Sequence, residues 1–558
     1  MQTMVQTTHG QPNDAAAFAH HGCVTAQQVH ARLDTQEEWA FVDVREQGAF
    51  DKGHAFWACN APLSHLEWVL PALVPRHQTP LVLMDESDEG LARRAAQRLT
   101  QWGYTHIAIL EGGLHAWRLA QLPVHAGIYV PSKAFGEFVE HHHHTPAIDV
   151  EQLKKWKHQG QDLLLVDCRP FEEFNQASLP GSINCPGMEL VTRVPGLVRS
   201  PDTLVVVHCA GRTRGIIGAQ TLINANVVPH VVTLTNGMAG WLLSGEKLTH
   251  GNAQVAPEAS TASVQKARLS AAQLAREVAL PTIDLQQLEA LQQEDHRTLY
   301  LFDVRTPEEF HKGHFPGARL APGGQLIQTF DAFVGTRGSR IVLCDDDDVR
   351  ARLTGYWLKL MGWSDIYVLE DPAAPSHWVV DGHSTANRSW VAAGSGLPTT
   401  SPPTLEASEL HQQLPSGEVV VLDLSDSLKF GQSHIPGAWF AVRARLEEAL
   451  AKVPPHRLLV LTSEDGSFAS VAWDDAQALS NVPVVVLQGG NQAWRAAGLP
   501  TASGRDRLTT CNDDVWYSPL ERPDPVAAIH EYLNWEIGLS EHLALERGVR
   551  FQGPRPKT

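Results

Sequence analysis

The stretch Leu204-Val205-Val206-Val207-His208-Cys209-Ala210-Gly211-Arg212-Thr213-Arg214-Gly215 decides how this chain folds. Its apolar first part predicts a buried strand, and the small and apolar residues 216–225 predict a helix after it. A cysteine therefore lies in a short loop between the C-terminal end of a strand and the N-terminus of a helix. In parallel α/β sheets, ligands bind at this place.

The loop has the composition of a nucleophilic site. Backbone N–H groups and the dipole at a helix N-terminus favour negative charge, and Arg212 and Arg214 add two cations. We expect these groups to lower the pKa of the Cys209 thiol below the value of about 8.5 for a free cysteine. A thiolate in a cup of donors can attack an electrophile and stabilise the anionic product. A buried structural cysteine is the alternative, and the two arginines argue against it.

Composition narrows the class of protein. A chain of 558 residues is expected to form about three to five domains, and its formal net charge of −18 disfavours nucleic acid and anionic membranes as partners. The seven cysteines are scattered without a C-x-x-C pair, which fits a reducing compartment. Residues 1–21 are polar, and no apolar stretch reaches the ~18 residues of a membrane span. We therefore expect a cytoplasmic protein.

One structural unit recurs along the chain. An apolar strand that ends in Asp-x-Arg occurs at residues 41–45, 165–169 and 301–305, and a fourth version at 421–425 has lost the arginine. Each version is followed by a Gly/Pro turn, a second apolar strand, a helix and a third strand. In three versions the third strand ends in a Gly-rich turn with a tryptophan, which we expect to be a core residue. Strands that alternate with helices predict a parallel sheet with helices on both faces.

We predict an α/β protein of four tandem, doubly wound parallel-sheet domains, called repeats 1 to 4 below, and a helical C-terminal tail. The predicted boundaries are 22–127, 145–250, 266–380 and 402–505 for the repeats and 506–558 for the tail. Residues 128–145, 251–263 and 391–403 are predicted as linkers of low hydrophobicity, with the histidines 141–144 solvated rather than bound to a metal.

The tail contains one predicted helix. Val526, Ile529, Leu533 and Ile537 are spaced three or four residues apart, like the apolar stripe of an amphipathic helix, and Gly538 would end it. We expect this helix to pack on a domain.

The fixed order of these motifs, repeated four times over about Gly22 to Gly504, resembles the rhodanese-like sulfurtransferase family. The resemblance implies that Cys209 attacks the outer sulfur of a donor such as thiosulfate, holds it as a persulfide, and passes it to cyanide or a thiol. The substrate-binding residues would be those of the loop, which supply backbone N–H donors: Ala210, Gly211, Arg212, Thr213, Arg214 and Gly215. Arg212 and Arg214 would hold the anionic donor. No cofactor and no metal is expected.

Only repeat 2 is expected to be catalytic. Repeat 1 has Asp85 near the cysteine position, and repeat 4 has Thr462-Ser463. Repeat 3 has Cys344, but four aspartates follow at 345–348, and these carboxylates would raise the pKa of the thiol and repel an anionic donor. We also expect repeat 1 to pair with repeat 2, and repeat 3 with repeat 4, so that a fragment ending near Gly251 would keep a complete pocket.

Two other functions remain open. In cysteine-loop phosphatases, a Cys-x5-Arg loop binds phosphate. Four residues lie between Cys209 and Arg214, which makes a tighter ring suited to sulfur. The spacing from Cys344 to Arg350 is longer, but that loop is acidic. The third possibility is a non-enzymatic scaffold, because three of the four repeats lack the chemistry.

Overall fold

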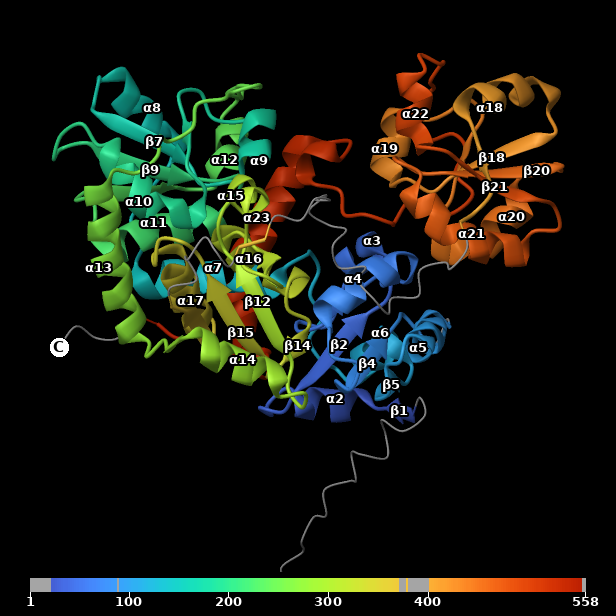
Figure 1. The fold of residues 1–558 in the computed structure, drawn as a ribbon. Coiled ribbons are helices and arrows are strands. Elements are labelled where there is room, and N and C mark those ends of the chain that lie inside the picture. Colours follow the sequence, from blue (N-terminus) through green and yellow to red (C-terminus); the bar gives the residue numbers. More distant parts are fainter. Residues whose placement is uncertain (1–21, 88–89, 371–377, 380–400, 554–558) are drawn as a thin grey trace, which may run out of the picture.

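The structure, a computed structural model, describes residues 22–87, 90–370, 378–379 and 401–553. Four α/β units and a C-terminal helix follow one another along the chain (Figure 1), which confirms the predicted fold class. The N-terminal residues 1–21 and most of the predicted linker 391–403 lie outside the described residues. In the described part of the chain, no helix combines the length and the apolar character that crossing a membrane requires.

The four sheets share one strand order, in which the strand before the loop is central. The strands of each sheet, in spatial order, are β1 (Gly22–Val24), β5 (Ile107–Leu110), β4 (Leu81–Met84) and β2 (Trp39–Asp43), with β3 (Cys59–Asn60) also beside β2, in repeat 1; β6 (Ala147–Ile148), β10 (Val231–Leu234), β9 (Leu204–His208), β7 (Leu163–Asp167) and β8 (Ile183–Asn184) in repeat 2; β11 (Thr282–Ile283), β16 (Ile366–Leu369), β15 (Arg340–Cys344), β12 (Leu299–Asp303) and β13 (Arg319–Leu320) in repeat 3; and β17 (Thr404–Leu405), β21 (Val484–Leu487), β20 (Leu458–Thr462), β18 (Val419–Asp423) and β19 (Trp439–Phe440) in repeat 4. All of these neighbours pair in parallel.

Helices cover both faces of each sheet. They are α2 (Ala26–Arg32), α3 (Gln47–Asp51), α4 (Leu66–Leu73), α5 (Leu91–Gln101) and α6 (Gly113–Leu119) in repeat 1; α8 (Val150–His158), α9 (Phe171–Gln176), α10 (Leu190–Arg193), α11 (Thr213–Ala225) and α12 (Gly237–Leu243) in repeat 2; α14 (Leu285–Gln293), α15 (Pro307–Lys312), α16 (Gly323–Gln328) and α17 (Arg350–Leu360) in repeat 3; and α18 (Ala407–Gln413), α19 (Ser427–Gln432), α20 (Leu446–Lys452), α21 (Ser467–Leu479) and α22 (Gly490–Ala496) in repeat 4.

The central strand β9 is apolar up to its last residue, His208, because both of its faces are buried. Val205 and Val207 pack into the core on one side of the sheet, and Val206 packs into the core on the other side. This is the burial that a parallel strand between two helical layers requires. The repeated tryptophans Trp117, Trp241 and Trp494 are also buried, as predicted.

The repeats pair differently from the prediction. Repeat 2 packs on repeat 3, and their apolar residues form one continuous core. Within it the Trp357 indole donates to Thr221 Oγ1 at 2.9 Å, and Arg350 forms an ion pair with Glu189 at 2.8 Å. The predicted pairing of repeat 1 with repeat 2 is therefore wrong. A fragment ending near Gly251 would expose the repeat 2 half of this core, so we no longer expect it to be stable.

Repeat 1 packs on repeat 4, which lies above it in Figure 1. The interface contains a buried ion pair, in which the Arg443 guanidinium donates to both oxygens of Glu67 at 2.8 Å. Repeat 3 also contacts repeat 1, because the short strand β14 (Thr336–Arg337) pairs antiparallel with β2 and extends the sheet of repeat 1. These contacts join repeats that are far apart in the sequence, and neither composition nor motif spacing indicated them.

Two of the predicted linkers overlap helices, and most of the third lies outside the described residues. The predicted linker 128–145 contains α7 (Val130–His143), whose residues 130–137 are all buried, so the prediction of a solvated linker is wrong there. Its hydrophobic residues Val130, Ala134, Phe135 and Val139 account for this burial. The helix α13 (Thr261–Glu277) packs between repeats 2 and 3.

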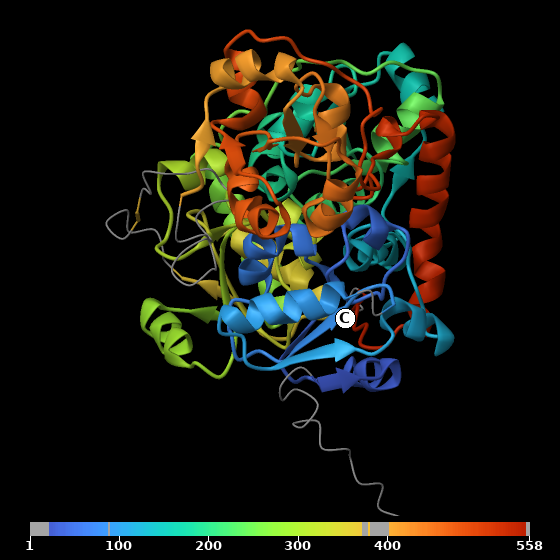
Figure 2. The ribbon, with the colours of Figure 1, turned by 90° about the vertical axis from the view of Figure 1, so that its right-hand side faces the viewer.

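The tail forms α23 (Pro525–His542), which Figure 2 shows along one side of the molecule. The helix packs on α7 and also contacts α12 of repeat 2, which confirms that it packs on a domain, but it continues through Gly538. The predicted stripe is correct for Ile529 and Leu533, which are buried, and wrong for Val526 and Ile537, which are 57% and 42% exposed. Tyr532, Glu536 and Leu539 complete the packed face instead.

The pairing of repeats 1 and 4 can be tested at Arg443. Replacing it (Arg443→Met) leaves the buried Glu67 carboxylate with only a long contact to Arg98, so we expect the free energy of unfolding to fall by about 3 kcal/mol. A double-mutant cycle with Glu67→Gln, measured by denaturant unfolding of the full chain, isolates the contact between the repeats.

The matched control is Arg457→Met, because Arg457 forms an exposed pair with Glu418. Exposed pairs contribute about 0 to 1 kcal/mol. A coupling energy near zero between Arg443 and Glu67 would contradict the proposed interface.

Candidate functional site

Cys209 directly follows β9 and is 3% exposed. The loop is held by the N-terminus of α12, where the N–H groups of Met238 and Ala239 donate to the carbonyl oxygens of Cys209 and Ala210 at 3.0 and 2.9 Å. Gly237 has φ +49°, and a Cβ atom there would lie 2.3 Å from the Cys209 carbonyl oxygen. The Gly-rich turn that the repeats share therefore allows this close approach.

The loop forms the predicted cup around the sulfur, but the pKa of the thiol is raised rather than lowered. Burial is the largest cause of the raised pKa. The charge of Arg214 and the backbone N–H groups of Gly215 and Gly211 act in the opposite direction, and the carboxylate of Glu536 raises the pKa further. Arg214, Gly211 and Gly215 lower the pKa as predicted, but burial outweighs them, so the prediction of a lowered pKa is wrong.

Arg212 ties the loop to α7. Its Nε and Nη2 atoms donate to the two carboxylate oxygens of Glu137 at 2.6 and 2.7 Å, Nη2 also donates to Glu140, and Nη1 donates to Asn236 Oδ1 at 3.1 Å. Burial raises the pKa of Glu137 to about 7 in spite of this pair. The guanidinium of Arg212 is thus already engaged by carboxylates, a role that the sequence did not indicate.

Arg214 is the cation whose charge acts on the sulfur. Its Nη1 and Nη2 atoms donate to the two oxygens of Glu173 in α9 at 2.7 and 2.9 Å. Nη1 also donates to Gln325 Oε1, in α16 of repeat 3, at 3.0 Å. The Cys209 loop is therefore supported from the neighbouring repeat.

The Asp-x-Arg pattern recurs in three repeats, and in each of them its aspartate and arginine form an internal ion pair. In repeat 2, Arg169 Nε and Nη2 donate to the carboxylate of Asp167 at 3.0 and 2.7 Å, and both residues are buried. The same bidentate pair joins Arg45 to Asp43 and Arg305 to Asp303. In each of the three repeats this pair lies at the end of the strand.

The C-terminal helix α23 covers the loop. A methyl group added at Gly211 would lie 3.5 Å both from Glu536 Oε2 and from Tyr532 Cε1. Glu536 is 1% exposed; its Oε1 accepts a hydrogen bond from Thr213 Oγ1 at 2.8 Å, and its Oε2 has no hydrogen-bond partner among the described residues. Burial, and then the charge of Glu536, raise the pKa of the Tyr532 phenol well above its usual value.

A buried lysine of α7 anchors this cover. The Lys133 ammonium lies over the rings of Trp535 and Tyr532, with 4.7 and 4.9 Å between Nζ and the ring centroids. Burial lowers the pKa of Lys133 to about 8, while Glu536 opposes the shift. The cation-π contacts hold α23 on α7 and so above the loop.

The other repeats place an oxygen where repeat 2 has its sulfur. Strand pairing aligns His208 with Cys344, since Asp167 pairs with His208 and Asp303 with Cys344. Asp345, not Cys344, therefore occupies the position of Cys209. Its carboxylate accepts hydrogen bonds from the N–H groups of Asp348, Val349 and Ala351 at 3.1, 3.0 and 2.9 Å. Burial and the neighbouring Asp347 raise the pKa of the Asp345 carboxyl well above its usual value, so a buried carboxyl group fills the donor cup.

Repeats 1 and 4 follow the same pattern. Asp85 Oδ2 accepts from the N–H of Ala92 at 3.0 Å, and Ser463 Oγ accepts from the N–H of Ala469 at 3.2 Å. Cys344 lies at the end of β15 itself, where burial raises the pKa of its thiol well above the usual value. The spacing inferred from Cys344 to Arg350 is corrected accordingly, because the loop of repeat 3 begins at Asp345.

Sequence reasoning missed the residues that surround the loop from other elements. These are Glu137, Glu173, Gln325, Tyr532 and Glu536, which lie far apart along the chain. The predicted tail helix was the only signal for the last two. The histidines 141–144 end α7, and no group of three metal-ligating side chains is assembled within the residues that the structure describes.

Comparison with known proteins identifies the family. The rhodanese-like domain family matches at residues 25–120, 149–244, 284–371 and 406–497, which is more than half of the chain. A crystal structure of a thiosulfate sulfurtransferase from Pseudomonas aeruginosa is 40% identical, covers 95% of this chain and 99% of its own, and superposes with a TM-score of 0.86.

A curated relative shares a single domain. An HTH-type transcriptional regulator from Mycobacterium tuberculosis is 31% identical over 105 residues, which are 19% of this chain and 45% of the regulator, so the match spans less than half of that protein. The matches together support a sulfurtransferase type of enzyme. On the strength of four matched domains and a relative similar along almost its whole length, the chain belongs to the rhodanese-like domain family.

Proposed function

We propose that this protein transfers sulfane sulfur from thiosulfate or a similar donor to a nucleophilic acceptor, such as cyanide or a thiol, through a persulfide on Cys209. One observation carries the proposal: the Gly215 N–H, which lowers the pKa of the Cys209 thiol, occupies the position of the Ala351 N–H, which donates to the Asp345 carboxyl group in repeat 3. A cup of N–H donors that holds an oxygen acceptor in one repeat is suited to hold a thiolate or a persulfide in another.

The proposed reaction has two displacement steps. The Cys209 thiolate attacks the outer sulfur of thiosulfate, the bond between the two donor sulfurs breaks, and sulfite leaves with the electron pair. The persulfide anion then lies among the loop donors that we predict, from Ala210 to Gly215. The acceptor attacks the terminal sulfur, and Cys209 leaves as a thiolate, so no external oxidant or reductant is needed.

This site differs from an open, cationic loop in two respects: carboxylates lie next to its arginines, and side chains of α23 lie over the loop. Glu137 and Glu140 engage Arg212, Glu173 engages Arg214, and Glu536 adds a carboxylate above the loop. An anionic donor is therefore held by backbone donors and by the partly compensated charge of Arg214. Because Tyr532 and Glu536 lie over Gly211, we propose that these side chains of α23 move when a donor reaches the sulfur.

The nucleophile can be tested directly. After incubation with thiosulfate, we expect the intact mass of the wild-type protein to increase by one sulfur atom, and Cys209→Ser to abolish both this adduct and thiocyanate formation from cyanide. The matched control is Cys344→Ser, which should keep most of the activity because that thiol lies within a strand and its pKa is raised well above the usual value. Equal losses in the two variants would show that the assignment is wrong.

The position of Glu536 over the loop leads to a prediction about the pH dependence of sulfur uptake. The thiolate is the reacting form, so sulfur uptake should increase as the pH rises through the raised pKa of Cys209. Glu536→Gln removes a negative charge that raises this pKa, and the pH profile of kcat/KM for the donor should shift to lower pH.

The matched control for this test is Glu531→Gln, since Glu531 lies on the same helix, is exposed and pairs with Arg522. Its profile should coincide with that of the wild type. An unchanged profile in Glu536→Gln would mean that this carboxylate does not act on the sulfur.

A further inference from the structure

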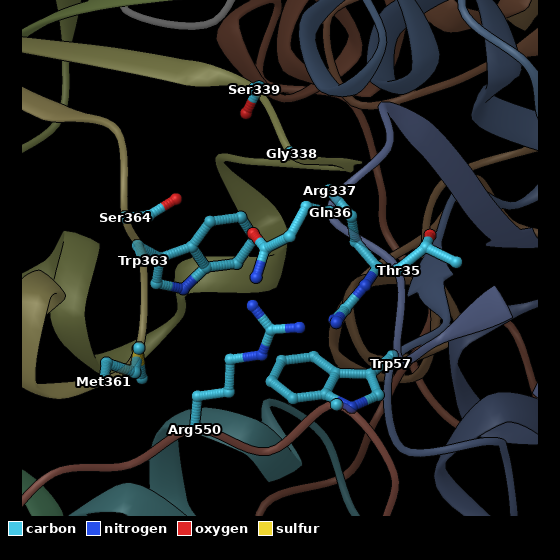
Figure 3. Close-up of a pocket in the computed structure, with 12 residues that line it drawn as sticks. Thr35, Gln36, Trp57, Arg337, Gly338, Ser339, Met361, Trp363, Ser364 and Arg550 are labelled. Atoms are coloured by element: carbon cyan, nitrogen blue, oxygen red, sulfur yellow. The ribbon is translucent and has the colours of Figure 1, made fainter.

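A second cationic site lies away from Cys209, in a cleft where repeat 1, repeat 3 and the C-terminal segment meet (Figure 3). We call it the junction cleft and define it by Gln36 and Trp57 of repeat 1, Arg337 and Trp363 of repeat 3, and Arg550 of the segment after α23. Figure 3 shows the Arg550 guanidinium between Trp363 and Trp57, with the Arg337 guanidinium and the Gln36 side chain directed into the same space.

Neither of the two arginines of the cleft forms an ion pair with a carboxylate of the described residues. Arg337 Nη2 donates to the Leu33 carbonyl oxygen at 3.2 Å, and Arg550 Nη2 donates to the Asp34 carbonyl oxygen at 3.0 Å. Among the described residues, neither guanidinium lies within 4.0 Å of a carboxylate, and the nearby Asp34 carboxylate pairs with Arg547 instead, at 2.9 Å. The cleft thus brings two like charges together in a protein of net charge −18.

Burial makes this arrangement costly. Arg337 Nε is buried and has no hydrogen-bond partner among the described residues. Burial, and second the charge of Arg550, lower the pKa of the Arg337 guanidinium to about 10. The Arg337 guanidinium also lies over the Trp57 ring, 4.4 Å from its centroid. Desolvated cations of this kind interact strongly with an anion that enters the site.

The fold holds the cleft in place from several directions. Gly548 has φ +70°, and a Cβ atom there would lie 2.7 Å from Arg337 Nη2, so glycine permits the segment to pack on this arginine. The Trp57 indole donates to the Arg547 carbonyl oxygen at 2.8 Å, and the Gln552 N–H donates to the Leu360 carbonyl oxygen at 2.7 Å. The two guanidiniums are therefore positioned before any ligand binds.

We propose that the junction cleft binds a small oxyanion, of the sulfate, phosphate or thiosulfate kind, between the guanidiniums of Arg337 and Arg550. The planar donor forks match the oxygens of such an anion, and the Gln36 side chain supplies an amide donor at the same place. The indole faces of Trp57 and Trp363 exclude water from two sides, which strengthens the attraction.

The proposed site is distinct from the Cys209 loop, and it does not depend on the proposed function. The two are connected by the chain, because residues 547–550 follow α23, the helix that covers Cys209. A bound oxyanion would cross-link repeat 3 to the C-terminal segment and hold this segment against repeat 1. Sulfate, phosphate and thiosulfate share the chemistry of the site, and separate titrations distinguish them.

The test is isothermal titration calorimetry on the full-length Cys209→Ser variant with sulfate, phosphate or thiosulfate, with sodium chloride keeping the ionic strength constant. We expect saturable binding of at least one of these anions. Arg550→Gln and Arg337→Lys should each weaken it by about tenfold or more, because each removes charge-assisted hydrogen bonds. The matched control is Arg547→Gln, which removes the same charge from an exposed pair and should leave the affinity unchanged.

Thermal unfolding supplies a second measurement that does not depend on calorimetric heats. Without the anion, Arg550→Gln should unfold at the same temperature as the parent variant or higher, because one of two repelling charges is removed. With saturating anion, the parent variant should become the more stable of the two. No binding, equal binding by Arg550→Gln, or a non-saturating stabilisation shared by all variants would overturn the proposal, since binding would then be absent, at the Cys209 loop or non-specific.

Discussion

The structure depends on one requirement that recurs in all four repeats. The backbone N–H groups of the loop after the central strand need a negatively charged or polar atom as acceptor. In every repeat, the strand that ends in the middle of the sheet is followed by a turn whose N–H groups point inward at a helix N-terminus. Those groups are buried, and leaving them without an acceptor would be costly. Repeats 1, 3 and 4 satisfy them with the side chains of Asp85, Asp345 and Ser463. Repeat 2 satisfies them with the sulfur of Cys209.

This constraint also explains why three repeats without the chemistry retain the same shape. A side-chain oxygen at the cup position accepts the N–H groups of the loop and so keeps the loop in place, and the domain remains a well-packed unit. The absence of a cysteine at this position is therefore compatible with the same fold. These repeats also make contacts with other repeats, such as the ion pair between Arg443 and Glu67 and the hydrogen bond from Arg214 to Gln325.

The sequence predicted the fold class, the four repeats and the strand–loop–helix setting of Cys209, because all of these follow from local patterns of hydrophobicity and turns. The prediction failed where the assignment of a loop position depended on a shift of one residue along a strand. The run Ile341–Leu343 could not show whether Cys344 ends the strand or begins the loop, and the pairing of Asp303 with Cys344 decided it. The pKa of Cys209 was mispredicted for a related reason: charges are visible in a sequence, whereas burial is not.

The sequence also could not predict contacts between segments that are far apart along the chain. The apolar spacing in the tail predicted a packed helix, but Glu536 interrupts the pattern as a polar residue, and nothing local indicated that it faces the Cys209 loop. In the same way, the run of histidines in α7 favours a solvated linker, although the hydrophobic residues of this helix are buried. Both errors concern residues whose partners lie in another repeat, where spacing carries no information.

The short strand β14 has a consequence for how the protein is made. Its residues Thr336 and Arg337 pair with Ala40 and Trp39, so the sheet of the first repeat is completed by a segment synthesised about three hundred residues later. Chains generally fold domain by domain as they leave the ribosome, but here the earliest domain keeps an open sheet edge until the third has emerged. Such an edge can pair with another chain. The interval between the two segments is therefore the stage of synthesis at which this protein is most exposed to misassembly.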